Sequence, residues 1–149
     1  MANIKTLFGL LVAVAAVVGV VAFGVAQASA SSAPIVISYA KTCAVGQCVG
    51  TAGDGGTLEM QVTGFRATGK AGQLTATERI TVGGDSFTAE MIGHVSPDGF
   101  IVLNGTVTDT EGSFDALAGA QVHQRSNLAS AAGTTTAWTG ELRLIPASA

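Results

Sequence analysis

The chain has 149 residues, 48% of them hydrophobic, and carries a formal net charge of −3. Ten acidic residues outnumber seven basic ones and no basic run occurs, so the composition excludes an electrostatic surface for nucleic acids. A chain of this length forms one domain with one hydrophobic core.

The first thirty residues have the pattern of an export signal. Lys5 is the only charged residue before an uncharged run over residues 7–26, and Ala28-Ser29-Ala30 supplies the small residues of a signal-peptidase site. The sequence therefore predicts a hydrophobic signal helix within residues 1–30 and a single all-β domain over residues 31–149. The run of 20 residues also suffices to span a bilayer, so an uncleaved anchor is the alternative, and only that alternative involves a membrane. Both readings predict a protein that is secreted, periplasmic or held at the cell surface.

Two cysteines follow the first predicted strand, which covers residues 35–41. Cys43 and Cys48 are separated by four residues, and in an exported protein such a pair most simply forms a disulfide. A redox pair would favour two intervening residues, and a zinc site would need two more ligands, for which only His94 and His123 remain, neither at a useful spacing. We therefore predict a structural disulfide, no metal and no cofactor.

Residues 51–68 are predicted to form a glycine-rich loop and then the second strand. The loop covers residues 51–56. In the strand, residues 58–68, apolar side chains at first alternate with polar ones, as in a strand with one buried face.

Residues 73–109 are predicted to form a meander of three antiparallel strands. Gly83-Gly84 fits a two-residue hairpin turn, and Pro97-Asp98-Gly99 fits a three-residue one. Because these turns fix the register, most apolar side chains fall on one face of the sheet. On that face the register places Glu78 opposite Ala89, Ala76 opposite Met91, and Gly93 opposite both Leu74 and Leu103.

The remaining residues are predicted to add a helical turn at 113–118 and two strands, over residues 120–127 and 134–145. A loop of small residues, 128–133, joins these two strands. The count is then about seven strands with frequent turns, which predicts a small antiparallel β-barrel of up-and-down topology. A β-sandwich is the alternative.

The glycine-rich segment of residues 104–120 resembles part of a known protein family. Its Asn-Gly-Thr-Val-Thr-Asp, Gly-Ser-Phe and Leu-Ala-Gly-Ala strings, with Trp138-Thr-Gly, resemble the strand and loop of allene oxide cyclase and dirigent-like barrels over about a quarter of the domain. The further glycine-threonine-glycine rhythm of those families is missing. The resemblance implies a closed barrel with an internal cavity, and no catalytic residue carries over from it.

Glu78 is the residue that suggests a site. The register places this carboxylate on the apolar face, where an unpaired charge is costly. Together with Ala89, Met91 and Gly93, it is predicted to line a ligand-binding cavity. The alternatives are that a β-bulge turns Glu78 away, or that Arg66 or another cation pairs with it.

Three classes of function fit these predictions. The first is a secreted non-catalytic barrel that binds a small apolar ligand or a surface partner. The second is a structural subunit of a surface layer or fibre, in which a homo-oligomer grows by strand addition along residues 35–37. The third is an isomerase or cyclase of the dirigent-like kind, with Glu78 acting on the substrate.

Overall fold

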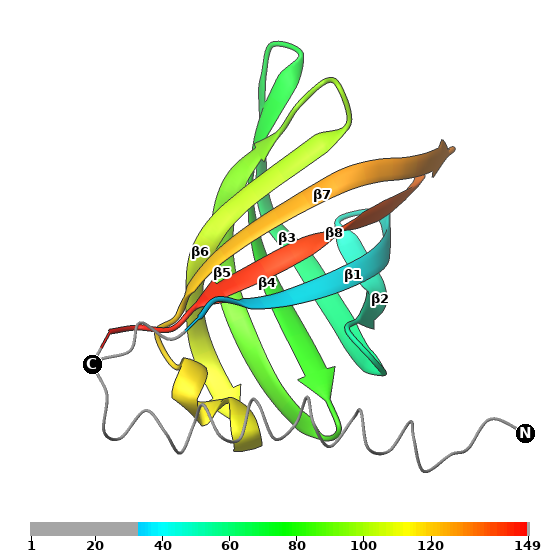
Figure 1. Cartoon of the computed structure of the whole chain (residues 1–149). Helices are drawn as coiled ribbons and strands as arrows, with labels where there is room; N and C mark the ends of the chain where they lie inside the picture. The colour runs from blue at the N-terminus through cyan, green and yellow to red at the C-terminus, as the bar shows by residue number, and fades with distance from the viewer. Residues whose placement is uncertain (1–32, 149) are drawn as a thin grey trace, which may run out of the picture. The chain divides into compact units, whose positions relative to one another are not determined.

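The structure is a computed structural model that describes residues 33–148, so the predicted signal helix and its cleavage site lie outside the described residues. The described part consists of strands joined by short turns, with one short 3-10 helix, η1, before the seventh strand (Figure 1). The strands are β1 (Ile35–Ala44), β2 (Gln47–Ala52), β3 (Gly56–Thr68), β4 (Ala71–Val82), β5 (Asp85–Val95), β6 (Phe100–Glu111), β7 (Gln121–Ala132) and β8 (Thr135–Ile145), and η1 covers Gly112–Leu117. Within residues 33–148, no helix has the length and hydropathy needed to cross a membrane.

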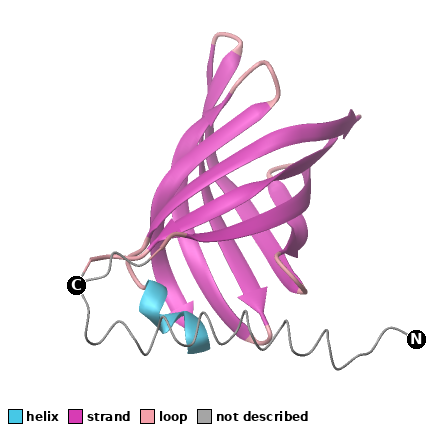
Figure 2. Cartoon of the chain, in the orientation of Figure 1, coloured by secondary structure: helices cyan, strands magenta, loops and turns pink. Residues whose placement is uncertain are grey.

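The eight strands close into one antiparallel barrel in the order of the sequence (Figure 2). Each strand pairs with the strands before and after it, and β1 pairs with β8 to close the ring, with Ile37 opposite Leu142. The predicted up-and-down barrel is confirmed, and the sandwich alternative is wrong for the described residues.

The meander over β4, β5 and β6 has the predicted register. Glu78 lies opposite Ala89, Ala76 opposite Met91, and Gly93 opposite both Leu74 and Leu103. Gly83 and Gly84 have φ angles of 61° and 95°, the left-handed conformation that a two-residue hairpin turn requires and that glycine adopts without steric cost.

Two predicted loops are partly strands. β2 is not among the predicted strands and includes residues 51–52 of the predicted loop 51–56, which raises the strand count to eight, and most of the predicted loop 128–133 continues β7 to Ala132. Neither segment has a clear alternation of apolar and polar side chains, so the periodicity does not reveal them. Each is held by its neighbours: β2 pairs with β1 and β3, and the end of β7 pairs with β8 beyond an irregularity between Leu128 and Ser130.

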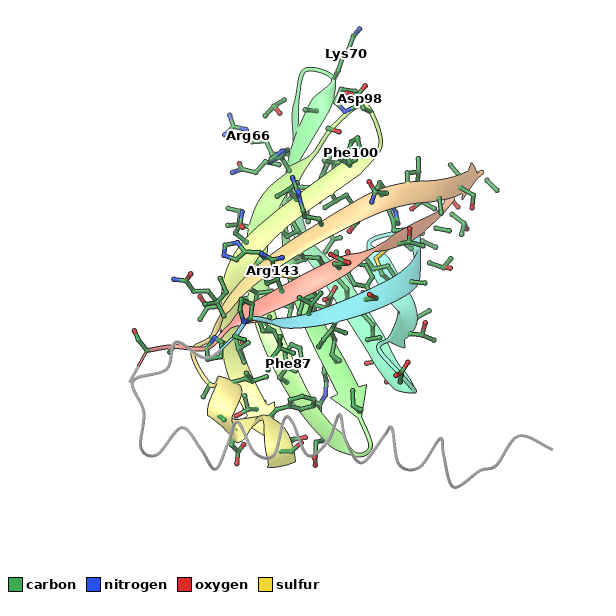
Figure 3. All side chains as sticks on the ribbon, viewed as in Figure 1. Arg66, Lys70, Phe87, Asp98, Phe100 and Arg143 are labelled. Atoms are coloured by element: carbon green, nitrogen blue, oxygen red, sulfur yellow. A yellow bond between two sulfur atoms is a disulfide. The ribbon has the colours of Figure 1, made fainter. Side chains whose placement is uncertain are left out.

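The barrel has two different ends. The β1–β2, β3–β4, β5–β6 and β7–β8 turns lie at one end, which we call the open end. The β2–β3 and β4–β5 turns and η1 lie at the other, the closed end. There the ring of Phe114 from η1 packs edge-on against Phe87, with centroids 5.3 Å apart, and Leu117 is buried. Figure 3 shows Phe87 close to η1 and Phe100 near the opposite end.

The lumen is filled by the inward-facing side chains of all eight strands. Its largest fully buried apolar side chains are those of Leu58, Ile80, Phe87, Leu103, Val122, Leu142 and Leu144. Cys43 and Cys48 form the predicted disulfide, which joins β1 and β2 next to their turn. Disulfides of this kind are typical of oxidising compartments.

Candidate functional site

Three polar side chains meet in the middle of the apolar lumen. Lys41 comes from β1, Glu78 from β4 and Gln124 from β7, and their exposed fractions are 2%, 1% and 0%. Each residue shares the inward parity of its strand, because Lys41 follows Tyr39, Glu78 follows Ala76 and Gln124 follows Val122 at a spacing of two. Closure of the barrel thus brings together three strands that are not neighbours in the sheet.

These three side chains form a compact hydrogen-bonded cluster. The Lys41 Nζ lies 3.2 Å from the Glu78 Oε2, and the Gln124 Nε2 donates to both carboxylate oxygens of Glu78 at 2.8 Å. Lys41 also donates to the Met60 Sδ at 3.0 Å and to the Gln124 Oε1 at 3.5 Å. Every buried side-chain nitrogen and oxygen of residues 33–148 has a partner, so the cluster is internally satisfied.

Tyr39 and Ser126 extend the cluster on the β1–β8–β7 side. The Tyr39 hydroxyl donates to the backbone oxygen of Arg125 at 3.1 Å and shares a short hydrogen bond with the Ser126 hydroxyl. The Lys41 Nζ lies 4.9 Å from the centroid of the Tyr39 ring, within the range of a cation–π contact. A Cβ atom at Gly140 would lie 2.6 Å from the Tyr39 hydroxyl, so glycine at this position makes room for the tyrosine.

Burial dominates the electrostatics of the cluster. It lowers the pKa of Lys41, since desolvation disfavours the ammonium ion, while the Glu78 carboxylate opposes this shift. Burial also raises the pKa of Tyr39, against the hydrogen bond from Ser126. The arrangement is a charge pair withdrawn from water and hydrogen-bonded on all sides.

An apolar hollow lies at the open end of the barrel. Its volume is about 340 Å³, and it borders the cluster through Met60, whose sulfur contacts Lys41. The side chains around it come from seven strands and are mainly apolar or sulfur-containing: Cys43, Cys48, Met60, Val62, Phe65, Leu74, Val95, Ile101 and Trp138, with Thr134 and Thr136 as the polar members.

A second hollow, of about 450 Å³, lies on the outer face of the barrel over β3–β6. It is larger, but its outward-facing side chains are mostly polar, including Thr63, Thr75, Thr77, Glu90 and Asn104. This hollow does not include any member of the buried cluster. We therefore take the hollow at the open end as the candidate ligand site, because its lining is mainly apolar and comes from seven of the eight described strands.

The predicted site residues all face the lumen, but they do not line the hollow at the open end. Glu78, Ala89 and Met91 are buried and Gly93 is half-buried, and of the four only Met91 borders a hollow, the one on the outer face. The alternative that a cation pairs with Glu78 is confirmed, with Lys41 as the cation rather than Arg66. A ligand-binding role for these four residues stays a prediction.

Lys41, Gln124 and Tyr39 are site residues that the sequence patterns do not single out. The alternation that placed Val122 inward also places Gln124 inward, and the spacing from Ile35 through Ile37 and Tyr39 reaches Lys41. The alternation therefore places Gln124 and Lys41 inward. A single polar residue at an inward position does not indicate a site, however, until its hydrogen-bonding partner is known. Within residues 33–148, no group of three or more histidine, cysteine or acidic side chains is arranged to hold a metal ion.

The fold and site define a small, closed, eight-stranded barrel with a buried charge cluster and an apolar hollow at one end. Comparisons with protein-family models, curated proteins and solved structures find no match to this chain. The resemblance to allene oxide cyclase and dirigent-like barrels therefore stays a prediction.

Proposed function

We propose that this protein is an exported, non-catalytic barrel that binds a small, mainly apolar ligand in the hollow at its open end. The observation that supports the proposal is the hollow itself, which is lined by apolar side chains from seven strands. Its volume of about 340 Å³ falls near the lower end of the range of ligand pockets, about 300–1,000 Å³, which favours a small ligand. The predicted signal peptide and the Cys43–Cys48 disulfide support export to an oxidising compartment.

The buried cluster favours binding over catalysis. A catalytic carboxylate must reach the substrate, whereas Glu78 is 1% exposed and both of its oxygens already accept hydrogen bonds. Lys41 is enclosed in the same way. The cyclase alternative would require this cluster to open.

The closed ring gives the fibre alternative little support, since each of the eight described strands has a partner on both sides over part of its length. Residues 35–38 nevertheless pair with β8 alone, because the pairing of β1 with β2 begins at Tyr39. The fibre alternative stays a prediction.

Titration with the neutral fluorophore N-phenyl-1-naphthylamine tests the proposal. Trp138 is the only tryptophan of the chain and lines the hollow, so energy transfer from it to the bound fluorophore reports occupancy. We expect saturable transfer with a stoichiometry near one. Native mass spectrometry of the purified protein would show any ligand that it already retains.

A matched pair of variants on β5 locates the binding site. Val95 lines the hollow at the open end, and Ile92 borders the hollow on the outer face. We expect Val95→Phe to weaken fluorophore binding by about tenfold or more, equivalent to about 1.4 kcal/mol, because the added ring occupies the hollow. Ile92→Phe should leave the affinity unchanged. Equal affinities in two folded variants would contradict binding at the open end.

A further inference from the structure

The open end also carries a cluster of exposed apolar side chains. The described residues include seven large apolar side chains that are exposed, and four of them lie around the mouth of the hollow or on its hairpins. We call these four the apolar rim: Val45 (92% exposed), Phe65 (65%), Phe100 (52%) and Leu128 (39%). They come from four different segments, namely the β1–β2 turn, β3, β6 and β7, and two of them, Val45 and Phe65, line the hollow itself.

Val45 gives the rim a second, independent feature. It lies in the β1–β2 turn with a φ angle of 50°, which is a conformation that β-branched residues rarely adopt. Asparagine or glycine would fit the turn better, and the side chain of Val45 makes almost no contact that could compensate. A strained, fully exposed valine at the mouth indicates that the side chain serves an interaction outside the barrel.

The charges of the barrel distinguish its two ends. At the closed end, five acidic residues lie in the connections or at the strand ends beside them: Asp54, Asp85, Asp109, Glu111 and Asp115. The basic residues nearest to this end are Arg79, which pairs with Glu111, and Arg143, so the acidic residues are in excess. At the open end, Arg66 and Lys70 on the β3–β4 hairpin outnumber Asp98 on the β5–β6 hairpin. Figure 3 shows Arg66, Lys70, Asp98 and Phe100 at this end. An anionic surface therefore attracts the open end and repels the closed end.

We propose that the open end docks on an anionic lipid surface, with the apolar rim inserted among the headgroups. Exposed aromatic and aliphatic side chains flanked by basic residues are what an interfacial lipid site requires. In this orientation the mouth of the hollow faces the lipid, so an apolar ligand can pass between the two without crossing water. The docking itself depends only on the rim and the charges, and it can be tested apart from ligand binding.

Tryptophan scanning with full-length protein tests the orientation. Phe100→Trp places a reporter on the rim, and Val36→Trp places one on β1 towards the closed end, where Val36 is 49% exposed. Each variant is mixed with vesicles of phosphatidylcholine and phosphatidylglycerol that carry brominated acyl chains, and the parent protein supplies the signal of Trp138 for subtraction. We expect bromine to quench the tryptophan at position 100 but not the one at position 36, and the quenching to weaken in phosphatidylcholine alone and at high salt. The first thirty residues are identical in both variants, so the comparison isolates the rim.

Two outcomes would overturn the proposal. Equal quenching at both positions, or none at position 100, would show that the rim does not enter the lipid. A blue shift at position 100 that depends on protein concentration without vesicles would assign the rim to a second copy of the chain instead.

Two further variants separate docking from folding. Val45→Asn should raise the melting temperature, because asparagine suits the left-handed turn, and should reduce vesicle binding several-fold. Lys70→Glu should weaken binding to the anionic vesicles by roughly twenty-fivefold, at about fivefold per charge, while the matched reversal Arg143→Glu, on β8 away from the open end, should have less effect. Vesicle binding unchanged by both Val45→Asn and Lys70→Glu would contradict the proposal.

Discussion

Lys41 and Glu78 show how a buried charge can be tolerated in a small barrel. Removing two charges from water costs several kcal/mol per ion, and the attraction between them offsets this only when the remaining hydrogen-bonding groups are satisfied. Gln124 provides that condition, because its amide donates to both oxygens of Glu78 and its carbonyl accepts from Lys41. The cluster also ties β1, β4 and β7 together across the lumen.

Lys41→Met is expected to destabilise the protein by about 3–5 kcal/mol, because it leaves the Glu78 carboxylate buried without its cation. The change would be measured by chemical denaturation. Arg79→Met is the control, since Arg79 pairs with Glu111 at the surface, where an ion pair contributes at most about 1 kcal/mol. The triple variant Lys41→Met, Glu78→Met, Gln124→Leu should recover most of the loss. An unchanged free energy of unfolding in Lys41→Met would show that Lys41 does not stabilise the buried Glu78 carboxylate as the geometry indicates.

Tyr39 predicts how stability changes in alkaline solution. Its pKa is raised in the folded protein by burial, while in the unfolded chain it ionises at about pH 10. Above that pH the unfolded state has lost a proton that the folded state keeps, so the contribution of Tyr39 is complete below about pH 10 and is lost as the pH rises further. The expected loss reaches about 1.4 kcal/mol per pH unit.

Comparison of the parent protein with Tyr39→Phe measures this contribution. Tyr39 is the only tyrosine of the chain, so tyrosinate absorbance reports its ionisation directly. We expect the absorbance to appear only as the parent unfolds, and the free energies of unfolding of parent and variant to converge above about pH 10. Burial lowers the pKa of Lys41, so the contribution of Lys41 to stability increases as the pH rises towards the ordinary pKa of lysine. This contribution is largely the same in the parent protein and in Tyr39→Phe. Ionisation of Tyr39 in the folded state near pH 10 would argue against its burial.

The candidate site was only partly accessible from the sequence. Glu78 was placed correctly because two glycine-bearing turns fix the register of its strand, whereas Lys41 and Gln124 lie on strands whose partners are distant in the chain. Alternation can say that a side chain faces inward, but it cannot say which inward residues of different strands lie at the same height in the lumen. That depends on the stagger of the closed barrel, which no local pattern encodes.

At the scale of elements, β4–β6 can be predicted from local sequence patterns, whereas β2 and the end of β7 cannot. The sequence of the meander contains strong turn residues and alternating apolar residues, and its predicted register is confirmed residue by residue. In β2 the alternation is interrupted by Gly50, and the end of β7 consists mainly of small residues. Both segments become strands because adjacent strands supply hydrogen-bonding partners, β1 and β3 for β2 and β8 for the end of β7, so tertiary context overrides weak local preference.

The β1–β2 hairpin forms part of the wall of the proposed site. Its turn holds the strained Val45, its disulfide joins Cys43 and Cys48 beside the turn, and both cysteines line the hollow at the open end. The disulfide restrains a hairpin with one short strand, and β2 has the fewest residues of the eight described strands. The stability of the hollow's wall therefore depends on an oxidising environment, in agreement with the proposed export.

At the scale of the whole molecule, the pairing of β1 with β8 allows the ends of the described barrel to be moved without disturbing its strand pairs. Ile35 lies opposite Leu144 at the closed end, far along the strands from the hollow. Antiparallel partners have Cα atoms about 5 Å apart, so a linker of about six residues can join the two ends of the described barrel. New ends can then be introduced at another turn without changing any strand pair.

Two circular permutants of the barrel would show whether the two ends have different roles. A permutant opened between Gly83 and Gly84, at the closed end, should keep the eight-stranded fold and bind N-phenyl-1-naphthylamine within about twofold of the parent, because the hollow is intact. A permutant opened between Val45 and Gly46 should also fold, since its disulfide still joins β1 and β2, but should bind the fluorophore several-fold more weakly, because both residues line the hollow. Far-UV circular dichroism and melting temperature establish folding in each case. Equal fluorophore affinities in the two folded permutants would show that the open end is not the binding site, whereas failure of the first permutant to fold would show that closure by β1 and β8 does not suffice to hold the barrel.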